Sequence, residues 1–485
     1  MNPSQVTAAL ARPSSAPAPG TGWPTRAATR PRTRNRYDPS SLSAIYKDPE
    51  WTITFVCFLL YLVAITSFRL PIGEVAIASA LAGMVLAPLR FRFPMFVFLS
   101  FVYLMWSLVG YQVTPYVDPV LEALEDGLKL ALIALVVVNA LKTTAQIRFF
   151  MIVMVVLFAI FPARGAIFNY ALYGYTLKES GRAVWVHIYE NPNDLAALTL
   201  LPLSLAAGLL IGDRNTWVRR GALASAFVFP IVILMTQSRG GFLALALFGV
   251  LTLAGHRKRF KSLLLVALLG VGVALAAPGG VWERMFNLAS AAESGNLGSA
   301  DDFNSAEQRT QIWSVAGTVI KQRPVVGVGL GAYRYAHYDM WLVNQQRYPM
   351  AGGTRDAHST YLTLIAETGW PGLLLFIAIV GSVWLKAVRA RRRWAAHFPK
   401  EARQLSFVVA GLFAFLVAGA FATFAQLAFL YIHLGVIYAL TTSLEKRGRA
   451  THSRGQTHAR DHRRGAGVSW PATRLTPAAA GSRLR

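Results

Sequence analysis

Apolar segments long enough to cross a bilayer recur along most of this chain, and they constrain its fold more than any other feature. The hydrocarbon core of a bilayer is about 30 Å thick, so a spanning helix needs about 20 mostly apolar residues. Inside the bilayer each segment must satisfy its own backbone hydrogen bonds, which favours helices. We therefore predict an all-α, polytopic integral membrane protein with about 12 transmembrane helices. The segments are 51–68, 71–89, 93–111, 124–141, 147–164, 194–211, 220–236, 240–255, 260–277, 364–388, 404–424 and 426–443.

The distribution of charge provides an independent test of this topology. The chain has 48 Lys plus Arg against 23 Asp plus Glu, a formal net charge of +25 that could indicate nucleic-acid binding. Most of these cations, however, fall in the two tails and in alternate loops, as the positive-inside rule predicts for a chain with both termini in the cytoplasm. We therefore interpret the charge as a signal of topology and expect membrane lipids, not nucleic acid, as the surroundings.

The same segments set the expected domain boundaries. Both tails are basic and poor in apolar residues, so we expect them to be disordered and cytoplasmic. The arginine-rich start also resembles an organelle transit peptide, although its prolines oppose the amphipathic helix of such peptides. Cys57 is the only cysteine, which excludes an intrachain disulfide. The expected units are a tail at 1–50, helices one to nine at 51–277 with a periplasmic loop at 165–193, a large periplasmic loop at 278–363, three more helices at 364–443 and a tail at 444–485.

The large loop contains the pattern of two short helices. Asn304 to Gln308 follows the pattern of a capping box and predicts a helix that ends near Gln322, before Arg323-Pro324. A second helix is predicted from about Asp356 to Glu367.

Five arginines lie at membrane boundaries on the predicted outside face: Arg164, Arg182, Arg239, Arg309 and Arg355. Arg239 is the most informative of them, because the short connection Gln237-Ser238-Arg239-Gly240 holds its guanidinium near the bilayer surface. One interpretation is an arginine that extends to lipid headgroups. The other is a planar, permanently charged group that binds a phosphate or pyrophosphate. Five such residues on one face favour the second interpretation.

His358 is the candidate base, because it lies beside Arg355 and Asp356 where the large loop re-enters the membrane. His358 could instead have a structural role. Glu367, nine residues later in the chain, is a further candidate, and it could instead cap a helix end or form an ion pair there.

Three other motifs favour structural roles. Gly327-Val-Gly329-Leu-Gly331 lacks the Lys-Ser/Thr of a nucleotide loop and predicts a tight turn. Asp301 and Asp302 have no nearby histidine, so we predict no metal site there. The residues Glu122, Glu125, Asp126 and Lys129 could form a proton relay, but a salt-bridge cluster at the membrane surface is favoured.

Several motifs, in this order along the chain, resemble the O-antigen ligase and polymerase family of bacterial envelope glycosyltransferases. They span about residues 180–385. One departure is that the family usually has His-Asn where this chain has His358-Ser359. The motifs are Glu190-Asn-Pro-Asn193-Asp194, Ser238-Arg239-Gly240-Gly241, Glu307-Gln308-Arg309 with Trp313, Pro324 to Gly331, and His358 to Gly372.

The resemblance implies an enzyme of the bacterial inner membrane with a periplasmic active site. It would move a glycan from undecaprenyl pyrophosphate to an acceptor, with inversion at the anomeric carbon and with neither a metal ion nor another cofactor. On this basis we expect His358 to act as the base and Arg239 to stabilise the leaving pyrophosphate. Arg309, Arg164, Arg182 and Arg355 would assist in binding the pyrophosphate, and Asn193, Tyr361 and Glu367 would have supporting roles.

The sequence leaves several hypotheses open for the acceptor and for the class of function. Lipid A-core as acceptor would make the protein a ligase, which the resemblance favours. A second glycan repeat would make it a polymerase, and a protein side chain would make it an O-oligosaccharyltransferase. A transporter or flippase for a polyanionic lipid would also need arginines at the membrane surface. Transporters, however, usually place their polar site near the bilayer midplane, where the later segments of this chain have almost no charge.

Overall fold

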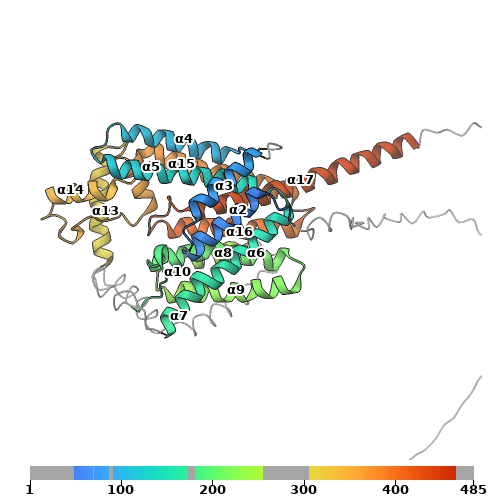
Figure 1. Cartoon of the computed structure of the whole chain (residues 1–485), viewed down its shortest axis with the longest axis horizontal. Helices are drawn as coiled ribbons and strands as arrows, with labels where there is room; N and C mark the ends of the chain where they lie inside the picture. Colours follow the sequence, from blue (N-terminus) through green and yellow to red (C-terminus); the bar gives the residue numbers. More distant parts are fainter. Residues whose placement is uncertain (1–48, 69, 87–90, 173–180, 255–304, 466–485) are drawn as a thin grey trace, which may run out of the picture. The chain divides into compact units, whose positions relative to one another are not determined.

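The structure is a computed structural model that describes residues 49–68, 70–86, 91–172, 181–254 and 305–465. Within these ranges it contains helices and no β-strand, so the predicted all-α fold is confirmed. Figure 1 shows most of the helices running alongside one another. The elements are α2 (Ile53–Ser67), α3 (Gly73–Leu86), α4 (Met95–Tyr111), α5 (Val117–Ala140), α6 (Thr144–Phe158), η1 (Ala159–Ala163), α7 (Arg164–Leu172), η3 (His187–Tyr189), α8 (Pro192–Gly212), α9 (Thr216–Met235), α10 (Arg239–Ala254), α13 (Ser305–Gln322), α14 (Tyr333–Val343), η5 (Pro349–Ala351), α15 (Thr360–Trp394), α16 (Pro399–Ala418) and α17 (Ala428–Gly465).

Six described stretches of helix are long and apolar enough to cross a membrane, and four shorter apolar helices accompany them. These helices fit a membrane protein. The predicted number of twelve spans is not confirmed, because four of them correspond to the shorter apolar helices, α5 is not among the six long apolar stretches, and the predicted span 260–277 lies outside the described residues. The six long stretches are Thr144–Ala171, Pro192–Gly212, Thr216–Met235, Thr360–Trp394, Pro399–Ala418 and Ala428–Thr451.

Helix α8 lies at the centre of the packing. It begins at Pro192, where the Asn191 side chain accepts a hydrogen bond from the Asn193 backbone N–H at 2.9 Å and so caps the helix. Most of its side chains are buried against α9, α16, α6 and α10. Gly411 of α16 allows the closest approach, because a Cβ there would collide with the Ser204 side chain.

Helix α15 is kinked at Gly369, where the backbone adopts φ +69°. Pro371 has no N–H, so the Glu367 carbonyl lacks its helical donor. It accepts instead from the Gly329 N–H at 3.0 Å, and the Trp370 N–H donates to the Pro324 carbonyl at 3.0 Å. The segment 324–329 therefore packs against α15 at the kink.

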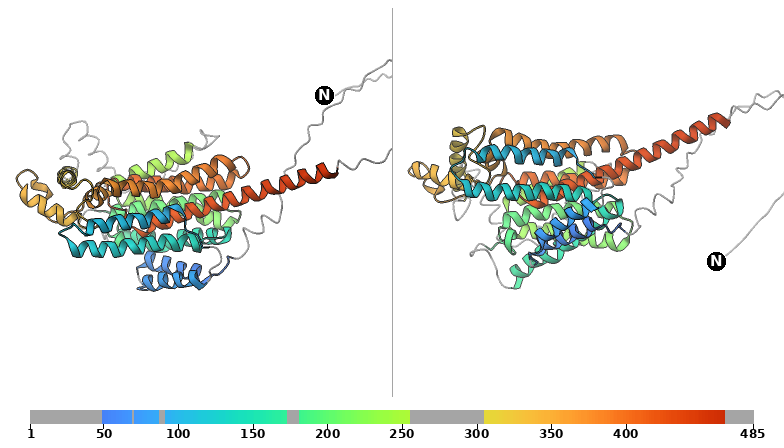
Figure 2. Two further views of the ribbon diagram at one scale, coloured as in Figure 1. Left: turned by 90° about the horizontal axis from the view of Figure 1, so that it is seen from above. Right: turned by 45° about the horizontal axis from the view of Figure 1, so that its top comes forward.

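Helices α13 and α14 lie at the end of the molecule where α15 begins, whereas α17 extends beyond the opposite end (Figures 1 and 2). We call the first end the outer end, after the predicted topology, and the second the basic end. The basic end carries Arg391, Arg392 and Arg393 in the last turn of α15.

Three features differ from the sequence-based expectations. Helix α14 was not predicted. The second short helix of the large loop begins at Thr360, not near Asp356, and continues through the kink into α15. Helix α17 continues to Gly465, past the expected boundary at 443. The first turn past this boundary is held by ion pairs of Lys386 with Glu445 at 3.0 Å and of Arg447 with Glu401 at 2.9 Å.

Several expectations lie outside the described residues. They are the disorder of the tails at 1–48 and 466–485, the start of the large loop at 278–304, and the role of Asp301 and Asp302.

Candidate functional site

Three polar residues, Arg182, Asn193 and Ser238, meet where α8 and α10 begin. Together with Arg239, which follows Ser238 in the chain, we call them the α8–α10 corner. The Arg182 guanidinium donates to the Asn193 side-chain oxygen at 3.1 Å and to the Thr236 carbonyl at 2.8 Å. The Ser238 hydroxyl donates to the same Asn193 oxygen at 2.8 Å. Asn193 therefore joins the segment before α8 to the first turn of α10. Arg239, half-buried, is the first residue of α10.

The corner is arranged to favour an anion. The N-termini of α8 and α10 both lie here, and a helix N-terminus carries a partial positive charge and free N–H groups. Gly240 and Gly241 keep the backbone of α10 close to its neighbours, because a Cβ on Gly241 would lie 2.6 Å from the Ala196 Cβ. The Arg182 guanidinium thus lies beside the N-termini of both helices, and Arg239 is the first residue of α10.

The second group of candidates is the His358 segment, residues 355–358, which is held by α13. Trp313 donates its indole N–H to the Ala357 carbonyl at 2.8 Å. Arg309 lies one helical turn before Trp313 on α13 and acts electrostatically on His358. Helix α13 therefore places one cation and one anchoring hydrogen bond beside the histidine.

His358 is half-buried and has backbone φ +46°, in the left-handed region that non-glycine residues avoid. Such strain costs of order 1–2 kcal/mol and persists only where the surroundings impose it. Burial lowers the pKa of His358 below its ordinary value of 6.5, and Arg309 and Arg355 lower it further while Asp356 opposes them. The imidazole is therefore neutral near pH 7 and able to accept a proton.

The two groups face the same region of the outer end. Asp356 acts electrostatically on Asp194, which follows Asn193 in the first turn of α8. The connection between α16 and α17 contacts residues next to both groups. Thr360, at the start of α15, donates its backbone N–H to the Gly419 carbonyl at 2.8 Å, and a Cβ on Gly240 would lie 3.1 Å from Phe421.

Three other candidates have structural contacts. Tyr361 donates its hydroxyl to the Leu416 carbonyl at 2.7 Å, which fastens α15 to the end of α16. The buried Glu367 carboxylate accepts from the Tyr333 backbone N–H at 3.4 Å. Arg164 lies over the Phe168 ring at 4.8 Å and lines a groove with the middle of α9. In the described part of the chain, no hydrogen bond connects Arg164 to the α8–α10 corner.

Two of the three motifs that favoured structural roles lie in the described residues and have structural contacts there. Gly327, Gly329 and Gly331 all have positive φ, at +75°, +107° and +77°, and form a turn packed on α15 and α5. Lys129 forms ion pairs with Glu125 at 3.0 Å and Glu74 at 3.1 Å, as expected for a surface salt-bridge cluster.

Sequence reasoning missed some of the residues that organise this site. Ser238, Asp356 and Trp313 were present in the recognised motifs, but their partners are distant in the sequence. His337 is fully buried, with one ring nitrogen 3.1 Å from the Tyr333 hydroxyl and the other 2.9 Å from the Ala351 carbonyl, so it braces α14. No sequence pattern distinguished this structural histidine from His358.

A comparison with protein-family models supplies the remaining evidence. Residues 223–377 match the model described as O-antigen ligase, a stretch that contains Arg239, Arg309, Arg355 and His358. No curated protein matches the chain. Among the described residues, no group of three or more His, Cys, Asp or Glu side chains is placed to hold a metal ion.

Proposed function

Because residues 223–377 match the O-antigen ligase family model, we propose an O-antigen ligase activity for this chain. It would transfer a glycan from undecaprenyl pyrophosphate to lipid A-core at the periplasmic face of the bacterial inner membrane. The observation that carries the proposal is the shared position of His358 and the arginines of the α8–α10 corner at one end of the helices. A neutral base beside fixed cations suits transfer from a pyrophosphate.

The proposed reaction is a single displacement. An acceptor hydroxyl oxygen attacks the anomeric carbon, and the bond from that carbon to the pyrophosphate oxygen breaks on the opposite face, which inverts the configuration. The hydroxyl proton passes to His358, and the bonding electron pair leaves with the pyrophosphate. General-base help of this kind contributes roughly 10² to 10⁴ in rate.

The cations have the second task of stabilising the leaving group. Charge grows on the pyrophosphate as the bond breaks, and preorganised cations in a partly water-free site are most effective against such charge. We assign this task to Arg239 and Arg309, with Arg182 and Arg355 in assisting positions. Asn193 would act indirectly by holding Arg182 and Ser238 in place. Arg164 is the weakest candidate, because it stacks on Phe168.

The experiment is a transfer assay with the purified full-length protein in detergent. Undecaprenyl-pyrophosphate-linked glycan is supplied with lipid A-core, with a second lipid-linked repeat or with a pilin-like protein, and the product is resolved by mass. Product with lipid A-core alone is the expected result. Product only with another acceptor would reassign the protein to a polymerase or a protein glycosyltransferase. No product from folded protein with any acceptor would contradict the proposal and favour lipid transport.

A further inference from the structure

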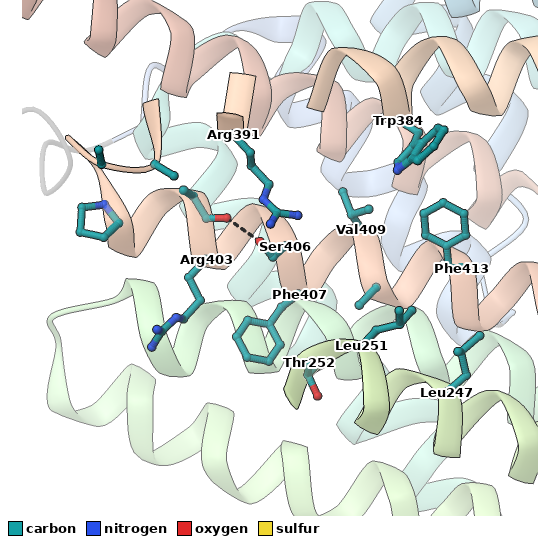
Figure 3. A pocket seen from close by; sticks show the side chains of 15 residues that line it. Leu247, Leu251, Thr252, Trp384, Arg391, Arg403, Ser406, Phe407, Val409 and Phe413 are labelled. Carbon is teal, nitrogen blue, oxygen red and sulfur yellow. Dashed lines mark hydrogen bonds between the residues drawn. The ribbon is translucent and has the colours of Figure 1, made fainter. Parts of the chain in front are cut away.

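A large groove opens at the basic end, and its lining continues along α10 as far as Leu247, eight residues after Arg239. It is lined by the second half of α10, the last turns of α15 and most of α16, and has a volume of about 1140 Å³ (Figure 3). Ligand pockets usually have volumes of about 300 to 1,000 Å³. The groove is therefore large enough for a long apolar chain.

The groove is amphipathic along its length. Leu247, Leu251, Trp384, Phe407 and Phe413 line its apolar part, as Figure 3 shows. Leu251 and Trp384 are each 39% exposed. In a membrane protein, such partly exposed apolar side chains face lipid.

Two arginines line the groove nearer the end of α15: Arg391 of α15 and Arg403 of α16. Both side chains are half-buried, and neither has a hydrogen-bond or ion-pair partner among the described residues. The acidic side chains nearby are already used, since Glu401 pairs with Arg447 and Glu445 pairs with Lys386. Among the described residues, Arg391 and Arg403 thus have no anionic partner, and the apolar part of the groove begins beside them.

We propose that this groove binds an anionic phospholipid of the cytoplasmic leaflet, with the phosphate between Arg391 and Arg403 and an acyl chain along α16. Charge complementarity selects the ligand, because an anionic headgroup matches the two unpartnered guanidinium groups and a zwitterionic one does so only in part. The leaflet follows from the positive-inside rule, since this end holds the basic turn of α15.

This lipid site is distinct from the proposed site of glycan transfer. From Gly369 to Trp394, α15 rises by roughly 40 Å at 1.5 Å per residue, so the proposed phosphate position at Arg391 lies near the opposite end of this helix from the site of transfer. The proposal therefore does not depend on the donor, the acceptor or the reaction.

The test is native mass spectrometry of the full-length protein in mild detergent, titrated with phosphatidylglycerol. The double variant Arg391→Gln/Arg403→Gln is compared with Arg392→Gln/Arg393→Gln. The second pair removes the same charge from exposed neighbours that do not line the groove. We expect the groove variant to bind phosphatidylglycerol about tenfold more weakly or worse, and the control variant to bind within about threefold of wild type.

Three further measurements on the wild-type protein test the proposal if the groove variant folds poorly. Phosphatidylcholine should bind wild-type protein at least tenfold more weakly than phosphatidylglycerol, and inorganic phosphate should not compete. A photoreactive acyl chain on phosphatidylglycerol should label peptides of α10, α15 and α16. Equal binding of both lipids, equal binding by both double variants, full competition by phosphate or labelling confined to other helices would each overturn the proposal.

Discussion

Replacement of His358 by glycine separates a catalytic role from a structural one. Because His358 has φ +46°, glycine removes backbone strain of about 1–2 kcal/mol. Glycine also makes the unfolded chain more flexible, which costs up to about 1 kcal/mol, and the packing of a half-buried ring is lost. These effects nearly cancel, so the melting temperature should change by only a few degrees.

Activity, in contrast, should fall sharply in His358→Gly. Without the base, the transfer rate should drop by roughly 10² to 10⁴ at saturating donor. The assay follows product formation at pH 7.5 together with thermal unfolding of the same preparation. His337→Gly is the matched control, because it removes a buried histidine with two hydrogen bonds and should reduce stability before it affects the reaction. A His358→Gly protein with more than a tenth of wild-type activity would refute the assignment of the base.

Four further predictions test individual contacts. The acid limb of kcat/KM against pH should lie below 6.5, and Asp356→Asn should move it lower still, because that carboxylate raises the pKa of His358; a limb that moves upward would contradict the assignment. Trp313→Phe removes one hydrogen bond of 2.8 Å, worth about 1 kcal/mol, and should slow transfer roughly fivefold in a steady-state assay with little change in expression. Gly369→Ala places a Cβ against the carbonyl oxygen of residue 325 at φ +69° and should destabilise the protein by at least about 2 kcal/mol in thermal unfolding. Asp213→Asn breaks a buried ion pair that joins α6 to α8 and should cost about 2 kcal/mol, whereas an unchanged melting temperature would show the pair to be dispensable.

The helices were predictable because hydropathy and helix signals act locally. The apolar segments agree with α2 to α6, α8 to α10 and α15 to α17 to within a few residues at most ends, and the capping-box pattern predicted α13. Helix α7 instead lies in the loop predicted at 165–193. The end of α17 was not predictable, because the ion pair of Glu445 with Lys386 joins residues 59 positions apart. Helix α14 was missed because its buried face depends on contacts with Glu367 and Ala351, which lie later in the chain.

The candidate site was only partly predictable for the same reason. Sequence motifs identified Arg182, Asn193, Arg239 and His358 as polar residues at one membrane face. They did not indicate that Asn193 joins Arg182 to Ser238, because that network depends on how α8 packs beside α10. They also grouped Arg164 with the other arginines, although the structure places it over Phe168 and beside the middle of α9.

The most direct measurement is the single-turnover rate of glycan transfer by Arg239→Gln, compared with wild type under saturating acceptor. Arg239→Gln removes the charge from the first residue of α10 and leaves the hydrogen bonds of Asn193 with Arg182 and Ser238 available. If the α8–α10 corner stabilises the leaving pyrophosphate, the rate should fall by at least 100-fold, a difference of about 2.7 kcal/mol in the barrier. A rate within threefold of wild type, from protein that folds and inserts normally, would contradict the proposed role of this corner in transfer.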